Sequence, residues 1–437
     1  MDLALRLGER YLWVDSLCII QDDVADKRHH LPLMGDIYHH AKLVVIAAVE
    51  DAHSGLPGIG SNIRQHTAIT ESVLDMRLAT CQPQLRPKLQ ATRWVTRGWT
   101  YQEATDRQAY WSCREESWCE DRFTEFEDIG IGVKHSSLFS ECPSSEVYFT
   151  DLQICKLGEY YFRVHEFSSR RFSDPEDTFW AFVGILRNTI PRFPQGYIWG
   201  LPKDCLDASL LWEADRANQY QGPLLLPTEK EGWLKVKIPS WCWIAKGRGV
   251  WYAACYSEVQ PMLKWHEPLE YNEKHSLNVS LEQEHETAKN LQSTIYPDKK
   301  ISSESNVFTF GLLRCTAETS LLTLRSFTMK ASQKKVLCLC CSMVRATVSL
   351  PSGTEIGTIR VPLHVTGGTE EMQGEFILLS KRVRSCEKEE IFDEPSYNIM
   401  LVRRGGDNQT AYRLAWTEVK KSDWEEAGRQ QKTIILG

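Results

Sequence analysis

The chain has 437 residues, a formal net charge of −7 and a pI near 6.0, with 42% hydrophobic and 25% charged residues. These values are typical of a soluble globular protein with about two or three domains, which needs neither metal nor disulfides to bury its cores. A general binder of phosphate backbones needs a basic face, so the mildly acidic balance predicts no nucleic acid partner.

Hydropathy and cysteine usage indicate the compartment. No stretch approaches the roughly 20 apolar residues that cross a bilayer, and the longest apolar block, residues 43–49, is far shorter. The start of the chain lacks the positive and then apolar pattern of a secretory signal. Most of the 14 cysteines lie singly inside apolar runs, which predicts buried free thiols. We expect a cytoplasmic protein with no membrane span and no metal site.

Two apolar runs flank a helical pattern near the amino terminus. Residues 11–20 are almost continuously apolar and predict a buried parallel strand that contains Asp15. Apolar residues then recur at helical spacing over residues 31–41, and residues 42–49 predict a second strand. Strand, helix and strand indicate a βαβ unit with a right-handed crossover. We assign residues 1–120 to an α/β domain with a parallel sheet and flanking helices.

A helical connector is predicted over residues 121–234. Asp174 followed by Pro175 is typical of a helix start. Apolar residues then recur on one face of the predicted helix, namely Phe179, Phe182, Val183 and Leu186.

A β-rich domain is predicted over residues 235–437, where short aromatic and β-branched runs alternate with turns. Such regular short strands favour an antiparallel sandwich or barrel. A charged stretch at about residues 267–306 lacks apolar spacing and predicts an exposed loop. The predicted strands include Ile238–Ile244, Thr358–Val365, Gly374–Ser380, Tyr397–Arg403 and Lys432–Leu436.

Asp15 is the first candidate site residue, because a carboxylate inside an apolar strand needs a partner. Loops after the strands of a parallel sheet build its ligand crevice, so one interpretation places Asp15 at such a crevice. The alternatives are a structural ion pair with an arginine such as Arg97, or a cap for a neighbouring helix.

The segment from Trp94 to Glu103 concentrates two indoles, Arg97, and the amide of Gln102 beside a carboxylate. Aromatic walls with one cation and one acid suit a nucleotide or a sugar. Thr100 and Glu103 also have the spacing of a capping box, which would make the segment a helix start instead. Both interpretations stay open.

Three other patterns are typical of structural elements more than of binding or catalytic sites. Residues 55–60 are rich in glycine but lack the spacing of a phosphate loop, so we expect a turn. The histidines flanking Asp36 lack a metalloprotease pattern and predict a solvated helix face. Trp241 and Trp243, two apart on a predicted strand, form either core or a stacking platform for sugars.

Four motifs, taken in order and spacing, carry a specific resemblance. They resemble the heterokaryon incompatibility (HET) domain of filamentous fungi over residues 1 to about 120. Segments 171–184, 239–243 and 424–437 are similar to the tail that often follows in that family. The four motifs are Tyr11 to Asp23, Met34-x-x-Ile-Tyr-x-x-Ala41, Gly55-Leu-Pro-Gly58 and Arg97-Gly-Trp-Thr-Tyr-Gln-Glu103.

The resemblance implies a role in non-self recognition and programmed cell death when incompatible cells fuse. It also implies a domain distantly similar to the TIR fold, some members of which cleave NAD with a glutamate beside the crevice of the sheet. By that analogy Glu103 is the catalytic candidate and Asp15 a second acidic group. Arg97, Trp99 and Gln102 would shape the pocket, with NAD as substrate and no certain cofactor.

The chain departs from the family pattern in two places. The family normally begins with a strand and loop of the kind Y-x-A-L-S-Y-x-W-G, so we expect a domain that lacks its first strand. The usual Leu, Leu, Ser and Arg after the Gln-Glu pair are replaced by residues 104–107. A missing strand would expose a sheet edge or leave the crevice one wall short.

We therefore expect a cytoplasmic HET-domain protein that acts with protein partners or by self-association. The alternatives are a signalling module that breaks no bond, an inactive truncated remnant, or a β domain that binds carbohydrate through Trp241 and Trp243.

Overall fold

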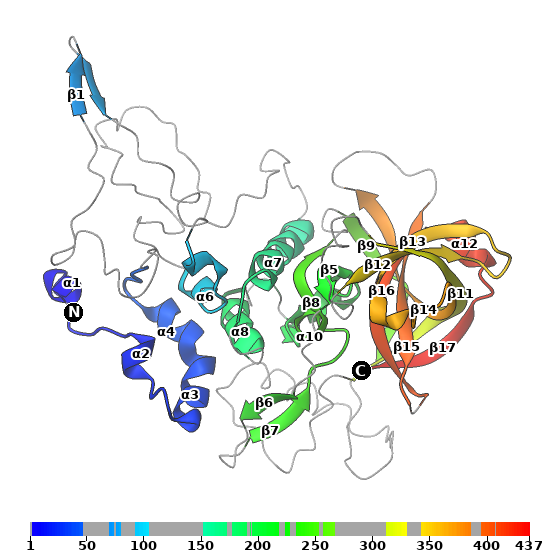
Figure 1. Cartoon of the computed structure of the whole chain (residues 1–437), viewed down its shortest axis with the longest axis horizontal. Helices are drawn as coiled ribbons and strands as arrows, with labels where there is room; N and C mark the ends of the chain where they lie inside the picture. The colour runs from blue at the N-terminus through cyan, green and yellow to red at the C-terminus, as the bar shows by residue number, and fades with distance from the viewer. Residues whose placement is uncertain are drawn as a thin grey trace. The chain divides into compact units, whose positions relative to one another are not determined.

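The chain divides into two compact units, which we describe separately. Unit 1 comprises residues 1–148 and 170–188, and unit 2 comprises residues 149–169 and 189–437. The computed structural model (Figure 1) describes residues 2–46, 70–73, 76–79, 92–104, 152–172, 177–189, 193, 195–217, 223–227, 233–252, 257–266, 312–329, 342–385, 395–406 and 408–437.

Unit 1 is mainly helical in its described part, with one antiparallel hairpin. The helix predicted over residues 31–41 is confirmed as a 3₁₀ turn, Leu31–Leu33, that leads into a helix. The elements are α1 (Asp2–Arg6), α2 (Asp15–Cys18), α3 (Val24–His30), α4 (Met34–His40), the hairpin β1 (Thr70–Val73) and β2 (Met76–Ala79), α6 (Thr100–Ala104) and α8 (Asp177–Thr189).

The strand predicted over residues 11–20 is wrong. Residues 11–14 have no ladder partner among the described residues, and the chain then turns into α2. The side chains of Tyr11 and Leu17 are 84% and 70% exposed, and Ile19 alone is buried. The reason is local, because Asp15 and Ser16 offer the backbone nearby hydrogen bonds that compete with a ladder. Residues 42–46 are irregular as well, so only the helix of the predicted βαβ unit is confirmed.

Helix α8 confirms the helix predicted after Pro175. Phe179, Phe182 and Leu186 are buried as expected, and Trp180, Ala181 and Ile185 are buried too. A helix that is apolar on all sides forms the centre of a core rather than its surface. Other elements of unit 1 therefore pack around α8.

Unit 2 begins with a long helix and then consists mainly of strands. Its described elements are α7 (Leu152–Ser168), β3 (Tyr197–Ile198), β4 (Leu201–Pro202), α9 (Leu206–Ser209), β5 (Trp212–Ala217), β6 (Pro223–Pro227), β7 (Trp233–Lys237), α10 (Trp243–Lys246), β8 (Gly247–Tyr252), β9 (Ser257–Pro261), β10 (Lys264–His266), β11 (Leu313–Thr328), β12 (Met343–Ser349), β13 (Glu355–Pro362), β14 (Glu371–Ser385), β15 (Ser396–Arg404), β16 (Thr410–Lys420), α12 (Lys421–Glu426) and β17 (Gln430–Leu436).

The carboxyl-terminal strands close into a barrel, which confirms the predicted β-rich region (Figure 1). Successive ladders join β11 to β17, β17 to β16, β16 to β15, β15 to β14, and β14 back to β11. The β16 to β17 ladder is parallel and spans two residue pairs, whereas the others are antiparallel and longer. Apolar side chains fill the core from the strands of the ring (Leu322, Leu324, Phe376, Leu378, Ile399 and Leu401), from β12 and β13 (Val344, Val348 and Ile359) and from α12 (Trp424).

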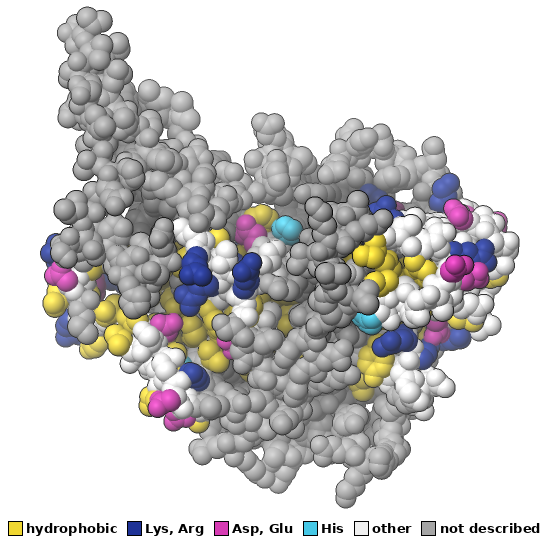
Figure 2. All heavy atoms as spheres, viewed as in Figure 1, with side chains coloured by type: hydrophobic (Ala, Val, Ile, Leu, Met, Phe, Trp, Pro, Cys, Tyr) yellow, Lys and Arg dark blue, Asp and Glu magenta, His cyan; other side chains and the backbone are white. Residues whose placement is uncertain are grey.

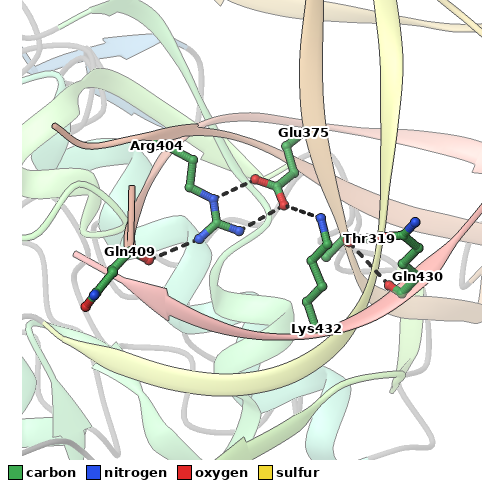
Figure 3. Close-up of polar contacts among 6 residues, drawn as sticks. All are labelled: Thr319, Glu375, Arg404, Gln409, Gln430 and Lys432. Atoms are coloured by element: carbon green, nitrogen blue, oxygen red, sulfur yellow. Dashed lines mark hydrogen bonds and ion pairs between the residues drawn. The ribbon is translucent and has the colours of Figure 1, made fainter. Parts of the chain in front are cut away.

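A charged cluster crosses one part of this barrel (Figure 3). Glu375 on β14 receives two hydrogen bonds from Arg404 on β15, at 2.7 and 2.9 Å, and lies 3.4 Å from the Lys432 ammonium on β17. Figure 3 shows the three side chains pointing toward one another, so the cluster links three strands of the ring.

The segment Ile238–Ile244 is not the predicted strand but a turn that leads into α10. Trp241 and Trp243 are 0% and 1% exposed, so the hypothesis of a carbohydrate platform on these two indoles is wrong. The Trp241 carbonyl accepts a 3.0 Å hydrogen bond from the Trp212 indole, which fixes the turn against β5.

Several predictions fall outside the described residues. These include the boundary at residue 120, the turn at residues 55–60 and the exposed loop at 267–306. Within the described part of residues 121–234, α7 and α8 are followed by the short strands β3 to β6. No helix in the described part of the chain is long and apolar enough to cross a membrane.

Candidate functional site

Asp15 begins the short helix α2 and is exposed to solvent. Its carboxylate accepts a 2.7 Å hydrogen bond from the backbone N–H of Ser16. The Gln21 amide donates to the carbonyls of Asp15 and Ile19, at 3.0 Å each, and so closes the turn around α2. Asp15 thus does not occupy an apolar strand, and its carboxylate faces water. The ion pairs of the described residues do not include one between Asp15 and Arg97.

The segment Trp94 to Ala104 folds as a 3₁₀ turn, Trp94–Thr96, followed by α6. The Thr100 hydroxyl lies 2.6 Å from the Trp94 carbonyl and 2.8 Å from the Arg97 carbonyl, to which it donates. Trp94, Thr100 and Tyr101 are buried, so the segment packs into unit 1 rather than lying on its surface. Glu103 lies in α6, and its side chain is outside the described residues.

Two predicted site residues bind α8. The Trp99 indole donates a 2.8 Å hydrogen bond to Asp177 Oδ2 in the first turn of that helix. The Gln102 amide donates to the Ala181 carbonyl at 2.6 Å and lies 3.3 Å from the Trp180 carbonyl. Gln102 is only 3% exposed, so its amide serves the core and not an open pocket.

Arg97 is exposed, and its backbone meets the residues just before α8. Arg97 and Arg171 form a parallel β-bridge, in which Gly98 N donates to Arg171 O at 2.8 Å and Arg171 N to Thr96 O at 2.7 Å. A Cβ atom on Gly98 would lie 1.9 Å from the Phe172 ring, so a larger residue at this crossing would force that ring to move. The Arg97 guanidinium is left at the surface of unit 1.

Arg170 places a buried cation under the same segment. Its guanidinium donates at 3.1 Å to the Arg97 carbonyl and at 3.1 Å to the Thr100 hydroxyl. It also lies 4.5 Å from the centroid of the Tyr101 ring, within the range of a cation–π interaction. The residue is 6% exposed, which makes these bonds important to the fold of the segment.

Helices α4, α6 and α8 meet at two glycines. A Cβ on Gly35 of α4 would lie 2.5 Å from the Gly184 Cα of α8, and a Cβ on Gly184 would lie 2.5 Å from the Gln102 amide nitrogen. Real Cβ atoms do not approach backbone so closely, so both helices need glycine at their contact. Figure 1 shows the three helices beside one another.

The structure therefore separates the predicted site residues into two groups. Trp99 and Gln102 converge on α8, whereas Asp15 and Arg97 are exposed on α2 and at the bridge. Sequence interpretation missed Arg170, Asp177 and the two glycines. The only available signal was the family-like phrase at residues 171–184, which does not reveal the surface it contacts.

The described residues contain no group of three His, Cys, Asp or Glu side chains placed to hold a metal ion. Exposed apolar side chains do gather on the amino-terminal elements, as Figure 2 shows. They are Leu5, Leu7, Tyr11, Leu12, Leu17, Ile20, Leu43 and Val45.

Comparison with known families adds one match. Residues 1–103 match the family model described as heterokaryon incompatibility protein (HET), which confirms the resemblance carried by the motifs. The match ends at Glu103, the last residue of the fourth motif. No curated protein and no solved structure matches the chain.

Proposed function

We propose that the chain acts in fungal non-self recognition and leads to programmed cell death, because residues 1–103 match the HET family model. The observation that carries this proposal is the family match, which spans all four motifs in their expected order. The proposal places the protein in the cytoplasm, where partner proteins from an incompatible cell become accessible after fusion.

The proposed chemistry is TIR-like cleavage of NAD. Water replaces nicotinamide on the ribose carbon, which yields ADP-ribose, free nicotinamide and a proton. Positive charge develops on the ribose as the C–N bond breaks, and a carboxylate stabilises it. Glu103 would supply that carboxylate, with Asp15 as a second acidic group. Support comes from α6, which holds Glu103 and is fixed by Trp99 and Gln102.

The test is inducible expression of the full chain in a filamentous fungus that lacks it. We expect wild type to slow growth, to stain cells with a death-reporting dye and to lower cellular NAD. Glu103→Gln should remove all three effects at equal protein level. Glu370→Gln, at an exposed glutamate of unit 2 outside the four motifs, is the control and should behave as wild type.

Two outcomes would contradict parts of the proposal. Equal loss of NAD with Glu103→Gln would remove Glu103 from the mechanism. No growth effect of wild type in any HET-competent host would contradict the role in cell death and favour an inactive remnant.

A second candidate function is signalling by self-association without bond cleavage. The exposed apolar side chains of unit 1 favour it, because exposed Tyr11 and Leu17 form part of a surface that water solvates poorly. This function predicts assembly that increases with concentration, measured by light scattering, at constant NAD. The Leu17→Ser variant should then be monomeric and fail to slow growth, whereas enzymatic action predicts toxicity from the monomer.

A further inference from the structure

We propose that Asp177 and Arg170, which lie well beyond the family match, are positioning residues for the motif at residues 97–103. They act on the motif from residues 170–188, which pack within the same unit although α7 belongs to the other. The consequence for growth rests on the proposed function, but the positioning itself does not.

Asp177 sets the orientation of the Trp99 indole. Its indole N–H is bound to the Asp177 carboxylate at 2.8 Å, and both side chains are half-buried. A hydrogen bond to a charged acceptor is stronger than a neutral one, especially away from bulk water. The carboxylate therefore selects one orientation of the indole and ties the start of α6 to the start of α8.

Arg170 contacts the motif at the turn before α6. Arg170 binds the Arg97 carbonyl and the Thr100 hydroxyl, so it holds the turn that leads into α6. The bridge between Arg97 and Arg171 adds two backbone bonds at the same place. The motif is thus bound by the Arg170 guanidinium before α6 and by the Asp177 carboxylate at Trp99.

Helix α6 is too short to be stable without contacts to other elements. A helix of five residues is not stable on its own, because nucleation costs more than so few hydrogen bonds return. The direction of α6 is therefore set by its contacts, chiefly the Gln102 amide on the Ala181 carbonyl and the close approach of α4 to α8 at Gly184. Glu103 follows Gln102 directly in α6, so the contacts that fix Gln102 also fix the backbone of Glu103.

Residues 170–188 therefore position the motif at residues 97–103. It supplies the face on which the motif acquires its shape, with Asp177 acting through Trp99 and Arg170 acting through Thr100. A HET domain cut at the end of the family match would retain Glu103 but lose the groups that hold the helix carrying it.

The experiment uses the full chain with tryptophan labelled by ¹⁵N in the indole ring. The Trp99→Phe variant assigns the Trp99 Nε1–H signal. We expect Asp177→Ala to shift that signal and to speed its hydrogen exchange at least tenfold, because the acceptor is gone. Asp177→Asn keeps an acceptor oxygen in the same place and should retain slow exchange. Asp423→Ala, which removes an acid from the first turn of α12, is the matched control.

A second measurement covers variants that fold poorly. Hydrogen exchange of the peptide at residues 97–104 should rise in Asp177→Ala and in Trp99→Phe, and no further in the double variant, because both remove one interaction. Additive effects, or an unchanged indole signal in Asp177→Ala, would overturn the positioning role.

Growth assays separate this inference from the proposed function. Loss of toxicity in Asp177→Ala with rescue in Asp177→Asn supports both. An indole signal that responds as expected, together with no effect of wild type on growth, supports positioning and contradicts the proposed function.

Discussion

The guanidinium of Arg413 lies 3.6 Å from the centroid of the Trp212 ring, inside unit 2. It also donates to the carbonyls of Leu210 and Trp212, and Arg413 N donates to the Ser240 hydroxyl at 2.8 Å. Burial lowers the pKa of Arg413 to about 9, so the side chain is still charged at neutral pH. One buried cation thus joins β16 to the segment before β5.

Removing this cation should destabilise unit 2. Arg413→Met leaves the Leu210 and Trp212 carbonyls without their donor, and we expect a loss of about 2–4 kcal/mol in unfolding free energy. Arg413→Lys keeps the charge but not the planar fork, so it should recover only part of that loss. Urea unfolding of the full chain measures both, with the exposed Arg403→Met as control. Equal stability of the Arg413 variants and wild type would contradict the argument.

Asp207 should make stability depend on pH. It is 5% exposed, and burial raises the pKa of its carboxyl to about 6. An unfolded aspartate titrates near about 3.9, so between about pH 4 and pH 6 the folded protein holds an extra proton and stability falls as pH rises. The free energy of unfolding should fall by about 2–3 kcal/mol in total, and this group should cause no further change above pH 6.

Asp207→Asn should remove that fall and leave the protein more stable than wild type at pH 7. Thermal unfolding at pH 4.5 and pH 7 measures the difference. Asp204→Asn, an exposed neighbour, should keep the wild-type profile. A profile of Asp207→Asn that still declines between these pH values would assign the effect to another group.

The cluster around Glu375 predicts the opposite dependence (Figure 3). Hydrogen bonds from Arg404 hold the pKa of the Glu375 carboxyl below its usual range. Its stabilising contribution is therefore complete above the ordinary glutamate pKa and is lost as pH falls through the lowered value. Glu375→Gln should cost on the order of 1 kcal/mol at pH 7 and less at acid pH, where the wild-type carboxyl becomes protonated too. The same cost at both pH values would show that packing, not charge, carries the effect.

The contact between α4 and α8 predicts opposite effects on stability for two glycine-to-alanine substitutions. Gly35→Ala forces a methyl group against the Gly184 backbone and should destabilise unit 1 by about 1–3 kcal/mol. Gly158→Ala in α7 meets nothing within 4 Å and should stabilise the protein by about 0.5–1 kcal/mol. Hydrogen exchange of α8 amides should rise in the first variant and stay unchanged in the second. Tolerance of Gly35→Ala would contradict the close helix contact.

Local patterns predicted the elements whose stability is itself local or repetitive. The aromatic and β-branched runs in residues 374–380, 397–403 and 432–436 predicted β14, β15 and β17, because such residues suit strands that bury side chains in a sheet. The capping and apolar signals after Asp174 likewise matched α8.

Two apolar runs were wrongly predicted to be strands, and the reason is physical. Residues 11–20 and 238–244 have the composition of strands, but a strand also needs a partner at the right distance, which composition does not encode. Asp15 and Ser16 turn the first run, and Pro239 begins the turn of the second. The pairing of Trp99 with Asp177 could not be predicted either, because it joins residues 78 positions apart.

β11 extends for 16 residues, and its first half pairs with β17 while its second half pairs with β12 and β14. One continuous strand is therefore a wall of the whole barrel, and neither half can open without straining the other. We expect the amides of β11 to exchange only through global opening, so that the barrel loses its structure in a single cooperative step instead of sheet by sheet.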